Sequence, residues 1–202
     1  MAKVLLGVTG SVAAIYTPNL FDDLKCAGHE VRIVATQSAC YFFDPAGLAS
    51  TPTGERDKNV ITLDADEWPG TGYQRGDPVL HIELRRWADL FVIAPCDANT
   101  LAKLALGITD NCMTCVYRAW DRTRPVVIAP AMNTLMWEHP VTARHLAQIA
   151  ADLGLSFRLV APIEKKLACN DIGLGAMAER DEIVKAIGAQ PLPSTKGNVN
   201  PV

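Results

Sequence analysis

Short apolar runs alternate along the chain with segments whose apolar residues recur every three or four positions. The runs predict strands buried on both faces, at residues 3–8, 30–35, 89–94, 125–129 and 156–160. The periodic segments predict helices at residues 12–25, 80–87, 101–106, 111–120, 141–153 and 179–187. Strands that alternate with helices in this way form a parallel sheet with right-handed crossovers. The pattern therefore predicts a single α/β domain with a doubly wound, Rossmann-like or flavodoxin-like parallel sheet and helices on both faces.

Three segments depart from this alternation. Pro18 lies inside the predicted helix 12–25, two turns from its start, where it removes a backbone donor and is expected to kink the helix. Residues 44–77 are rich in Pro, Gly, Asp and Thr, which predicts a long loop with a weak strand at 60–63. We expect the domain to occupy residues 1–188 and residues 189–202, rich in Pro, Ser, Asn and Gly, to be a disordered tail.

The composition excludes several classes of protein. The chain has 202 residues, of which 49% are hydrophobic and 20% charged, a balance unlike that of disordered, collagenous or coiled-coil proteins. A net charge of -3 without a basic block argues against a nucleic-acid partner. No apolar run reaches the roughly 18 residues of a membrane span, and no signal peptide is evident, so neither a membrane nor an export role is expected.

The six cysteines are scattered, and a chain of this size does not require disulfides to fold. A reducing cytoplasmic location is therefore expected. Cys112 and Cys115 form a C-x-x-C motif, which suggests zinc or redox chemistry. No second pair follows this motif in the sequence, so no metal site is expected.

Polar turns follow three of the predicted strands. Residues 7–11 (GVTGS) suit either a phosphate-binding turn or a plain strand-to-helix turn with Ser11 as N-cap, and this segment alone does not decide between the two. Residues 36–38 (TQS) and 97–100 (DANT) are equally ambiguous when taken singly. Ligands of doubly wound sheets bind beyond the carboxyl ends of the strands, where the three turns would surround one crevice. Together they predict a site for a phosphate-bearing cofactor.

A fourth segment after a predicted strand makes a family resemblance specific. Residues 130–137 (PAMNTLMW) are one of four motifs that occur in the order expected for one family. The other three are residues 80–89 (LHIELRRWAD), 97–100 (DANT) and 167–171 (LACND). From about residue 3 to residue 185 the chain resembles the homo-oligomeric flavin-containing cysteine decarboxylases, and especially those that act on phosphopantothenoylcysteine in plants and animals.

The resemblance implies FMN as cofactor and a homotrimer, or a dodecamer of trimers, with FMN near the subunit contacts. The candidate cofactor-binding residues lie in the polar turns and after the strand 125–129: Gly10, Ser11, Val12, Thr36, Ser38, Asp97, Ala98, Asn99, Thr100 and Ala131.

The resemblance also assigns roles to side chains. His81 matches the family's essential histidine, and an imidazole suits deprotonating or orienting a substrate thiol. Asn133 matches the residue that binds the substrate carboxylate, and Cys169 matches the proton donor of the phosphopantothenoylcysteine enzymes. Met136, next to Trp137, is expected either to contact the substrate or to pack in the core. His29, His139 and His145 are expected to have ordinary structural roles.

In the family scheme, FMN takes a hydride from the carbon bearing sulfur, and the resulting thioaldehyde accepts electrons as carbon dioxide leaves, giving an enethiol.

Tyr16 and Asn170 depart from the family pattern, which has a lysine near the position of Tyr16 and a glycine at the position of Asn170. Three functions follow. The first is decarboxylation of phosphopantothenoylcysteine in coenzyme A biosynthesis. The second, favoured by Tyr16 and Asn170, is decarboxylation of a peptide's C-terminal cysteine to an enethiol for aminovinyl-cysteine ring formation. The third is a non-catalytic, phosphatase-regulating flavoprotein.

Overall fold

The computed structural model describes residues 1–68, 70–72, 74–166 and 172–189. Its central sheet contains six parallel strands in the order β3-β2-β1-β4-β5-β6. The strands are β1 (Lys3–Val8), β2 (Glu30–Ala35), β3 (Ile61–Leu63), β4 (Leu90–Cys96), β5 (Val126–Pro130) and β6 (Phe157–Leu159). The chain reverses its winding direction between β1 and β4, as in the Rossmann arrangement. The predicted doubly wound α/β domain is confirmed.

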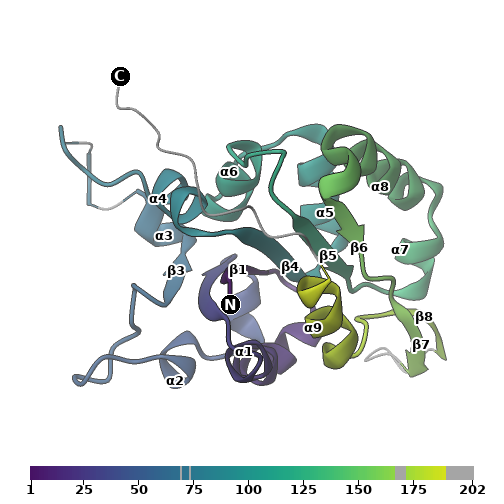
Figure 1. Cartoon of the computed structure of the whole chain (residues 1–202), viewed down its shortest axis with the longest axis horizontal. Helices are drawn as coiled ribbons and strands as arrows, with labels where there is room; N and C mark the ends of the chain where they lie inside the picture. Colours follow the sequence, from purple (N-terminus) through teal and green to yellow (C-terminus); the bar gives the residue numbers. More distant parts are fainter. Residues whose placement is uncertain (69, 73, 167–171, 190–202) are drawn as a thin grey trace.

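Helices cover both faces of the sheet (Figure 1). Residues of α1 (Thr17–Cys26) and α9 (Arg180–Gly188) share one hydrophobic core, on one face of the sheet. Residues of α4 (Leu80–Trp87), α5 (Ala98–Leu106), α6 (Cys112–Arg118) and α8 (Pro140–Leu153) build the second core. Alternate residues of β1 point to opposite cores, with Leu6 in the first and Leu5 in the second, and both are fully buried. This double burial explains why the strands read as continuous apolar runs.

The predicted helix 12–25 is two elements. Residues Val12–Tyr16 form the 3-10 helix η1, and α1 begins at Thr17. Pro18 therefore occupies the first turn of α1, where a backbone N–H has no partner within the helix to lose. The predicted kink inside a helix is wrong, because the proline stands at a helix start.

Several short elements were not predicted. The long loop 44–77 contains the predicted strand as β3, but also α2 (Pro45–Leu48) and α3 (Asp64–Glu67). The other unpredicted elements are the 3-10 helices η2 (Ala39–Tyr41) and η3 (Gly154–Ser156), α7 (Thr134–Glu138) and an antiparallel hairpin of β7 (Ile163–Lys166) and β8 (Ile172–Ala176). Strand β4 also continues through Pro95 and Cys96, where a turn is predicted. Elements of three to five residues are too short for hydrophobic periodicity to reveal.

Two expectations concern features outside the sheet. Within the described ranges, no helix combines the length and the hydropathy needed to cross a membrane. The five cysteines in those ranges all carry free thiols. The tail expected at 189–202 lies, from residue 190 onward, outside the described residues.

Candidate active site

The three predicted polar turns lie against one another at the carboxyl edge of the sheet. Thr9 joins the first turn to the third, because its hydroxyl donates to the Pro95 carbonyl (2.9 Å) and accepts from the Asp97 N–H (2.8 Å). Gly10 joins the first turn to the second: a Cβ at Gly10 would lie 2.4 Å from the Ser38 hydroxyl oxygen, so only glycine permits this approach. The predicted arrangement of three turns at one edge is therefore present.

Side chains in these turns also cap the helices that follow. The Ser11 hydroxyl accepts from the Ala13 N–H (3.4 Å), and the Asp97 carboxylate accepts from the Thr100 N–H (2.7 Å). In the second turn, the Thr36 and Ser38 hydroxyls lie 3.0 Å apart. Capping accounts for the residue types at Ser11 and Asp97 without a ligand, so their cofactor role stays a prediction.

A cavity of about 840 Å³ opens beside the first turn, between η1, the loop after β5, β8 and the start of α9. Three of the candidate cofactor-binding residues, Ser11, Val12 and Ala131, line it. The other candidates, in the second and third turns and at Gly10, are not part of the lining: Gly10, Thr36, Ser38, Asp97, Ala98, Asn99 and Thr100. The candidate set is thus divided between the cavity and the edge of the sheet next to it.

Asn133 is held at the cavity wall by hydrogen bonds of its own side chain and of the neighbouring backbone. Its side-chain oxygen accepts from the Leu135 N–H (2.9 Å), so Asn133 is the N-cap of α7. The preceding residue, Met132, donates its N–H to the Gly175 carbonyl (2.9 Å). Gly175 has φ of 152°, and a Cβ there would lie 2.3 Å from the Met132 carbonyl oxygen. The hairpin is therefore anchored against the Asn133 loop at a position that requires glycine.

The two residues predicted beside Asn133 differ in environment. Met136 is about half exposed, at 49%, and does not line the cavity. Trp137 packs against the second hydrophobic core, which agrees with the core alternative for this residue.

His81 lies near the amino end of α4 and contacts a buried carboxylate. Its Nδ1 forms a short hydrogen bond with Glu67 Oε1, and its backbone N–H donates to Glu67 Oε2 (2.9 Å). The Glu67 side chain is 3% exposed, against 24% for His81. The Cys112 thiol also contacts Glu67 Oε2 (3.4 Å). Glu67 is not among the predicted site residues, because it lies in the segment 44–77 that was predicted to be a loop.

His81 and Asn133 lie on opposite sides of the sheet's carboxyl edge. Glu67, which contacts His81, follows β3, whereas Asn133 follows β5, and β2, β1 and β4 stand between those two strands. Four strand spacings amount to about 19 Å. Figure 1 shows the same division, with α3 and α4 at one end of the molecule and α7 at the other. The two side chains therefore follow different strands of one chain, and those strands, β3 and β5, lie four spacings apart in the sheet.

The remaining predicted residues divide as follows. Cys169 and Asn170 lie outside the described residues. Tyr16 lines the cavity. His139 caps α8 through its Nδ1, which accepts from the Val141 N–H (3.2 Å), in keeping with a structural role.

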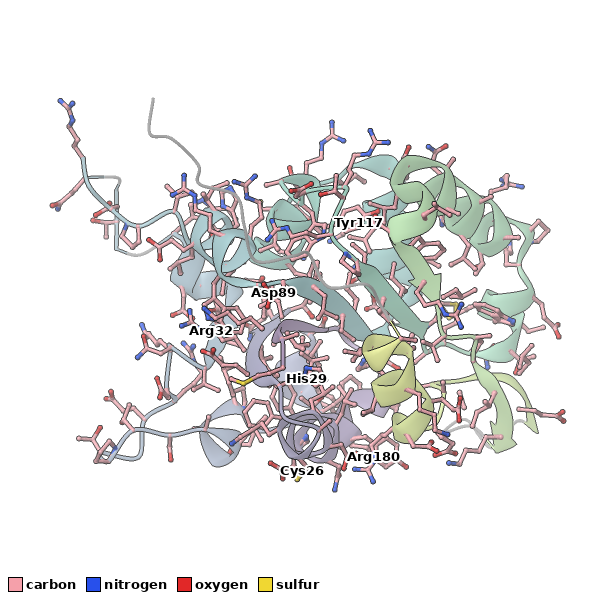
Figure 2. The ribbon with its side chains drawn as sticks, in the orientation of Figure 1. Cys26, His29, Arg32, Asp89, Tyr117 and Arg180 are labelled. Atoms are coloured by element: carbon pink, nitrogen blue, oxygen red, sulfur yellow. The ribbon has the colours of Figure 1, made fainter. Side chains whose placement is uncertain are left out.

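Two further features concern charges and thiols. Burial and the neighbouring Glu67 carboxylate raise the pKa of the Cys112 thiol, which favours its protonated form as a donor to Glu67. Arg180, which Figure 2 labels at α9, lines the cavity and forms an ion pair with Asp23 of α1 (3.1 Å).

Comparison with known proteins decides the family. Residues 1–191 match the family model named Flavoprotein. The chain belongs to the flavoprotein family. This flavoprotein is 49% identical to mouse phosphopantothenoylcysteine decarboxylase over 188 residues, which cover 93% of this chain and 86% of the mouse protein.

Solved structures agree with this assignment. A variant of PPC decarboxylase complexed with pantothenoylaminoethenethiol is 47% identical, with a TM-score of 0.77 and coverage of 93% of this flavoprotein and 96% of that chain. The FMN binding protein AtHal3 is 48% identical, with a TM-score of 0.73, covering 93% and 95% of the two chains.

Proposed function

We propose that this flavoprotein is an FMN-dependent decarboxylase that converts phosphopantothenoylcysteine to phosphopantetheine in coenzyme A biosynthesis. The observation that carries the proposal is Asn133, held at the wall of a cavity in a fold shared with a PPC decarboxylase that binds pantothenoylaminoethenethiol. Lys165, Glu179 and Arg180 also line this cavity, and because Lys165 pairs with Glu179 (3.3 Å), the three leave one net positive charge toward a phosphorylated substrate.

The cavity and the turns beside it fit FMN. A volume of about 840 Å³ lies within the range of cofactor sites, and the walls combine apolar Val12 and Ala131 with polar Ser11. The second turn adds the hydroxyls of Thr36 and Ser38, which are suited to phosphate or ribityl oxygens. When bound, FMN supplies a two-electron acceptor for the hydride on the carbon that bears sulfur.

The side chains of the chain itself handle protons and the carboxylate. The Asn133 carboxamide binds the substrate carboxylate without a full positive charge, which would otherwise stabilise the carboxylate against leaving as carbon dioxide. His81 takes the proton from the substrate thiol as the carbon–sulfur unit is oxidised. Cys169 would donate the proton when the enethiol is reduced to the saturated thiol, a step whose hydride is the one that bound flavin took from the substrate carbon.

These roles require an assembly. Because the strands that precede the two sites, β3 and β5, lie about 19 Å apart in one chain, we infer that a substrate in contact with both side chains lies between two chains. Such a shared site supports a homo-oligomer, and the homotrimer or dodecamer of trimers is the form that the family resemblance implies.

A second candidate is a decarboxylase of peptides that end in cysteine. Tyr16 favours it, because this aromatic residue lines the cavity at the place where the family pattern has a phosphate-attracting lysine. Arg180 offers a positive charge in the same cavity, and with the likeness to phosphopantothenoylcysteine decarboxylases it keeps the phosphorylated substrate as our first proposal.

Mass spectrometry of the product tests both proposals. The purified holoenzyme is incubated with phosphopantothenoylcysteine and, separately, with a set of peptides ending in cysteine. Loss of carbon dioxide alone from phosphopantothenoylcysteine is the expected result. Loss of carbon dioxide and two hydrogens from a peptide, with no reaction of the first substrate, would overturn the coenzyme A assignment and establish the second candidate.

A further inference from the structure

Glu67 is an acidic side chain enclosed by hydrogen-bond donors. It is the last residue of α3, a helix that packs against α4 and α6. Its two oxygens contact the His81 imidazole, the His81 backbone N–H and the Cys112 thiol. A buried carboxylate is costly unless donors of this kind surround it. This cost argues for a task that an apolar residue at position 67 would not perform.

The segment that carries Glu67 is itself firmly positioned. The neighbouring residue Asp66 accepts from the Leu63 N–H (2.8 Å), which fixes the start of α3. Asp66 also forms ion pairs with Arg56 (2.8 Å) and Lys58 (3.2 Å). The Asp64 carboxylate accepts from the Gln37 N–H (2.9 Å), which ties α3 to the second polar turn. Glu67 is therefore presented to His81 by a rigid segment.

The Glu67 carboxylate determines which nitrogen of the His81 imidazole carries the proton. A carboxylate only accepts hydrogen bonds, so the His81 nitrogen that contacts it, Nδ1, carries the proton. The other ring nitrogen, Nε2, then has a free lone pair. Cys112 adds a donor to Oε2 and, as a protonated thiol, adds no competing negative charge.

We propose that Glu67 is a positioning residue for His81: it holds the imidazole in the Nδ1–H tautomer, which presents Nε2 as the base for the substrate thiol. In the step it supports, the proton passes from the substrate sulfur to Nε2. The Glu67 carboxylate then offsets the positive charge of the resulting imidazolium. Glu67 itself touches neither substrate nor cofactor.

The tautomer can be measured without any turnover. In the holoenzyme labelled with ¹⁵N-histidine, the His81 signals are assigned by comparison with a His81→Asn variant. We expect Nδ1 to give the shift of a protonated ring nitrogen and Nε2 that of an unprotonated one. The opposite pattern would overturn the proposal.

Glu67→Gln is the decisive variant, because it keeps the shape of the side chain. The glutamine oxygen takes the place of Oε2, facing the His81 backbone N–H and the Cys112 thiol, and the NH₂ group faces Nδ1. The glutamine thus donates to Nδ1 and shifts the proton to Nε2. We expect the two ¹⁵N signals to exchange character and kcat to fall by about 100-fold or more, while KM changes by less than about twofold.

A matched control is Cys115→Ser, on the same helix as Cys112, because the Cys115 thiol donates to the Thr109 carbonyl (3.7 Å) rather than to Glu67. It should preserve the wild-type tautomer and rate. The inference rests on the proposed decarboxylase function, but different results would refute the function and the role of Glu67. A wild-type enzyme that releases no carbon dioxide from either substrate class would refute the function, whereas an active wild type with an equally active Glu67→Gln variant would refute only the role of Glu67.

Discussion

Mixing two inactive variants should restore activity if His81 and Asn133 serve one site from different protomers. His81→Asn removes the proposed base. Asn133→Asp keeps an N-cap for α7, since aspartate caps as well as asparagine does, but places a negative charge against the substrate carboxylate. Each variant alone should lose at least about 100-fold in kcat/KM.

The expected recovery follows from the geometry of the shared site. In a random one-to-one mixture, a site works when the protomer that supplies His81 is the Asn133→Asp chain and its neighbour is the His81→Asn chain. Each condition holds for half of the protomers, so about one quarter of the sites should work in the unselected mixture. Among trimers that contain both variants about one site in three should work, and among dodecamers about one in four. A site contained in one chain would give no recovery.

The assay uses co-expression of the two variants with different affinity tags and purification of the mixed assemblies over both. Carbon dioxide release per flavin is then compared with that of wild type. A matched control combines wild type with the double variant. Among mixed trimers a shared site retains about one sixth of full activity (about one quarter in dodecamers), whereas a site within one chain retains about one half. Mixed assemblies that carry both tags and stay inactive would refute the shared site.

Three other variants test separate contacts. Burial raises the pKa of Asp66, but hydrogen bonds from Arg56 and Leu63 outweigh it and hold that pKa below its usual range, so Asp66→Asn should lower the free energy of unfolding in urea at pH 7 by about 1 kcal/mol. That difference should disappear as the pH falls through the lowered pKa, and a pH-independent cost would contradict the charge argument. Gly175→Ala should destabilise the hairpin by about 1–3 kcal/mol, since its Cβ meets the Met132 carbonyl, and thermal unfolding measures this. Cys169→Ser should accumulate the enethiol, detected by mass, and a saturated product at the wild-type rate would exclude Cys169 as proton donor.

The sequence predicted the central sheet because each long strand is buried on both faces. Val4, Leu5 and Leu6 of β1 are all fully buried, and such runs are legible without knowledge of the fold. The prediction at Pro18 was wrong because periodicity does not reveal where a 3-10 helix ends and an α-helix begins. The hairpin of β7 and β8 escaped notice because its position depends on the contact of Gly175 with Met132, far from it in sequence.

The candidate site could be predicted only in part from the sequence, for a similar reason. Ser11 was predicted from its place after a strand, and Ala131 and Asn133 from the family resemblance, and all three line the cavity. Glu67 was missed because a carboxylate in a polar segment is ordinarily a solvated group. What distinguishes it is its 3% exposure and its contact with His81, fourteen residues away, and neither is visible in the sequence.

The motifs around His81 and Asn133 identify one chemistry, yet a single chain places them at two ends of a sheet edge. Each end is independently rigid: Glu67 and α3 hold the first, and the α7 cap together with the Gly175 contact holds the second. The local contacts of each end do not explain why both motifs occur in one chain. The proposed chemistry would explain it, because a substrate carboxylate at Asn133 and a substrate thiol at His81 would be only a few bonds apart. An assembly that joins two such edges from two protomers would satisfy that requirement, and oligomerisation would then be part of the catalytic geometry.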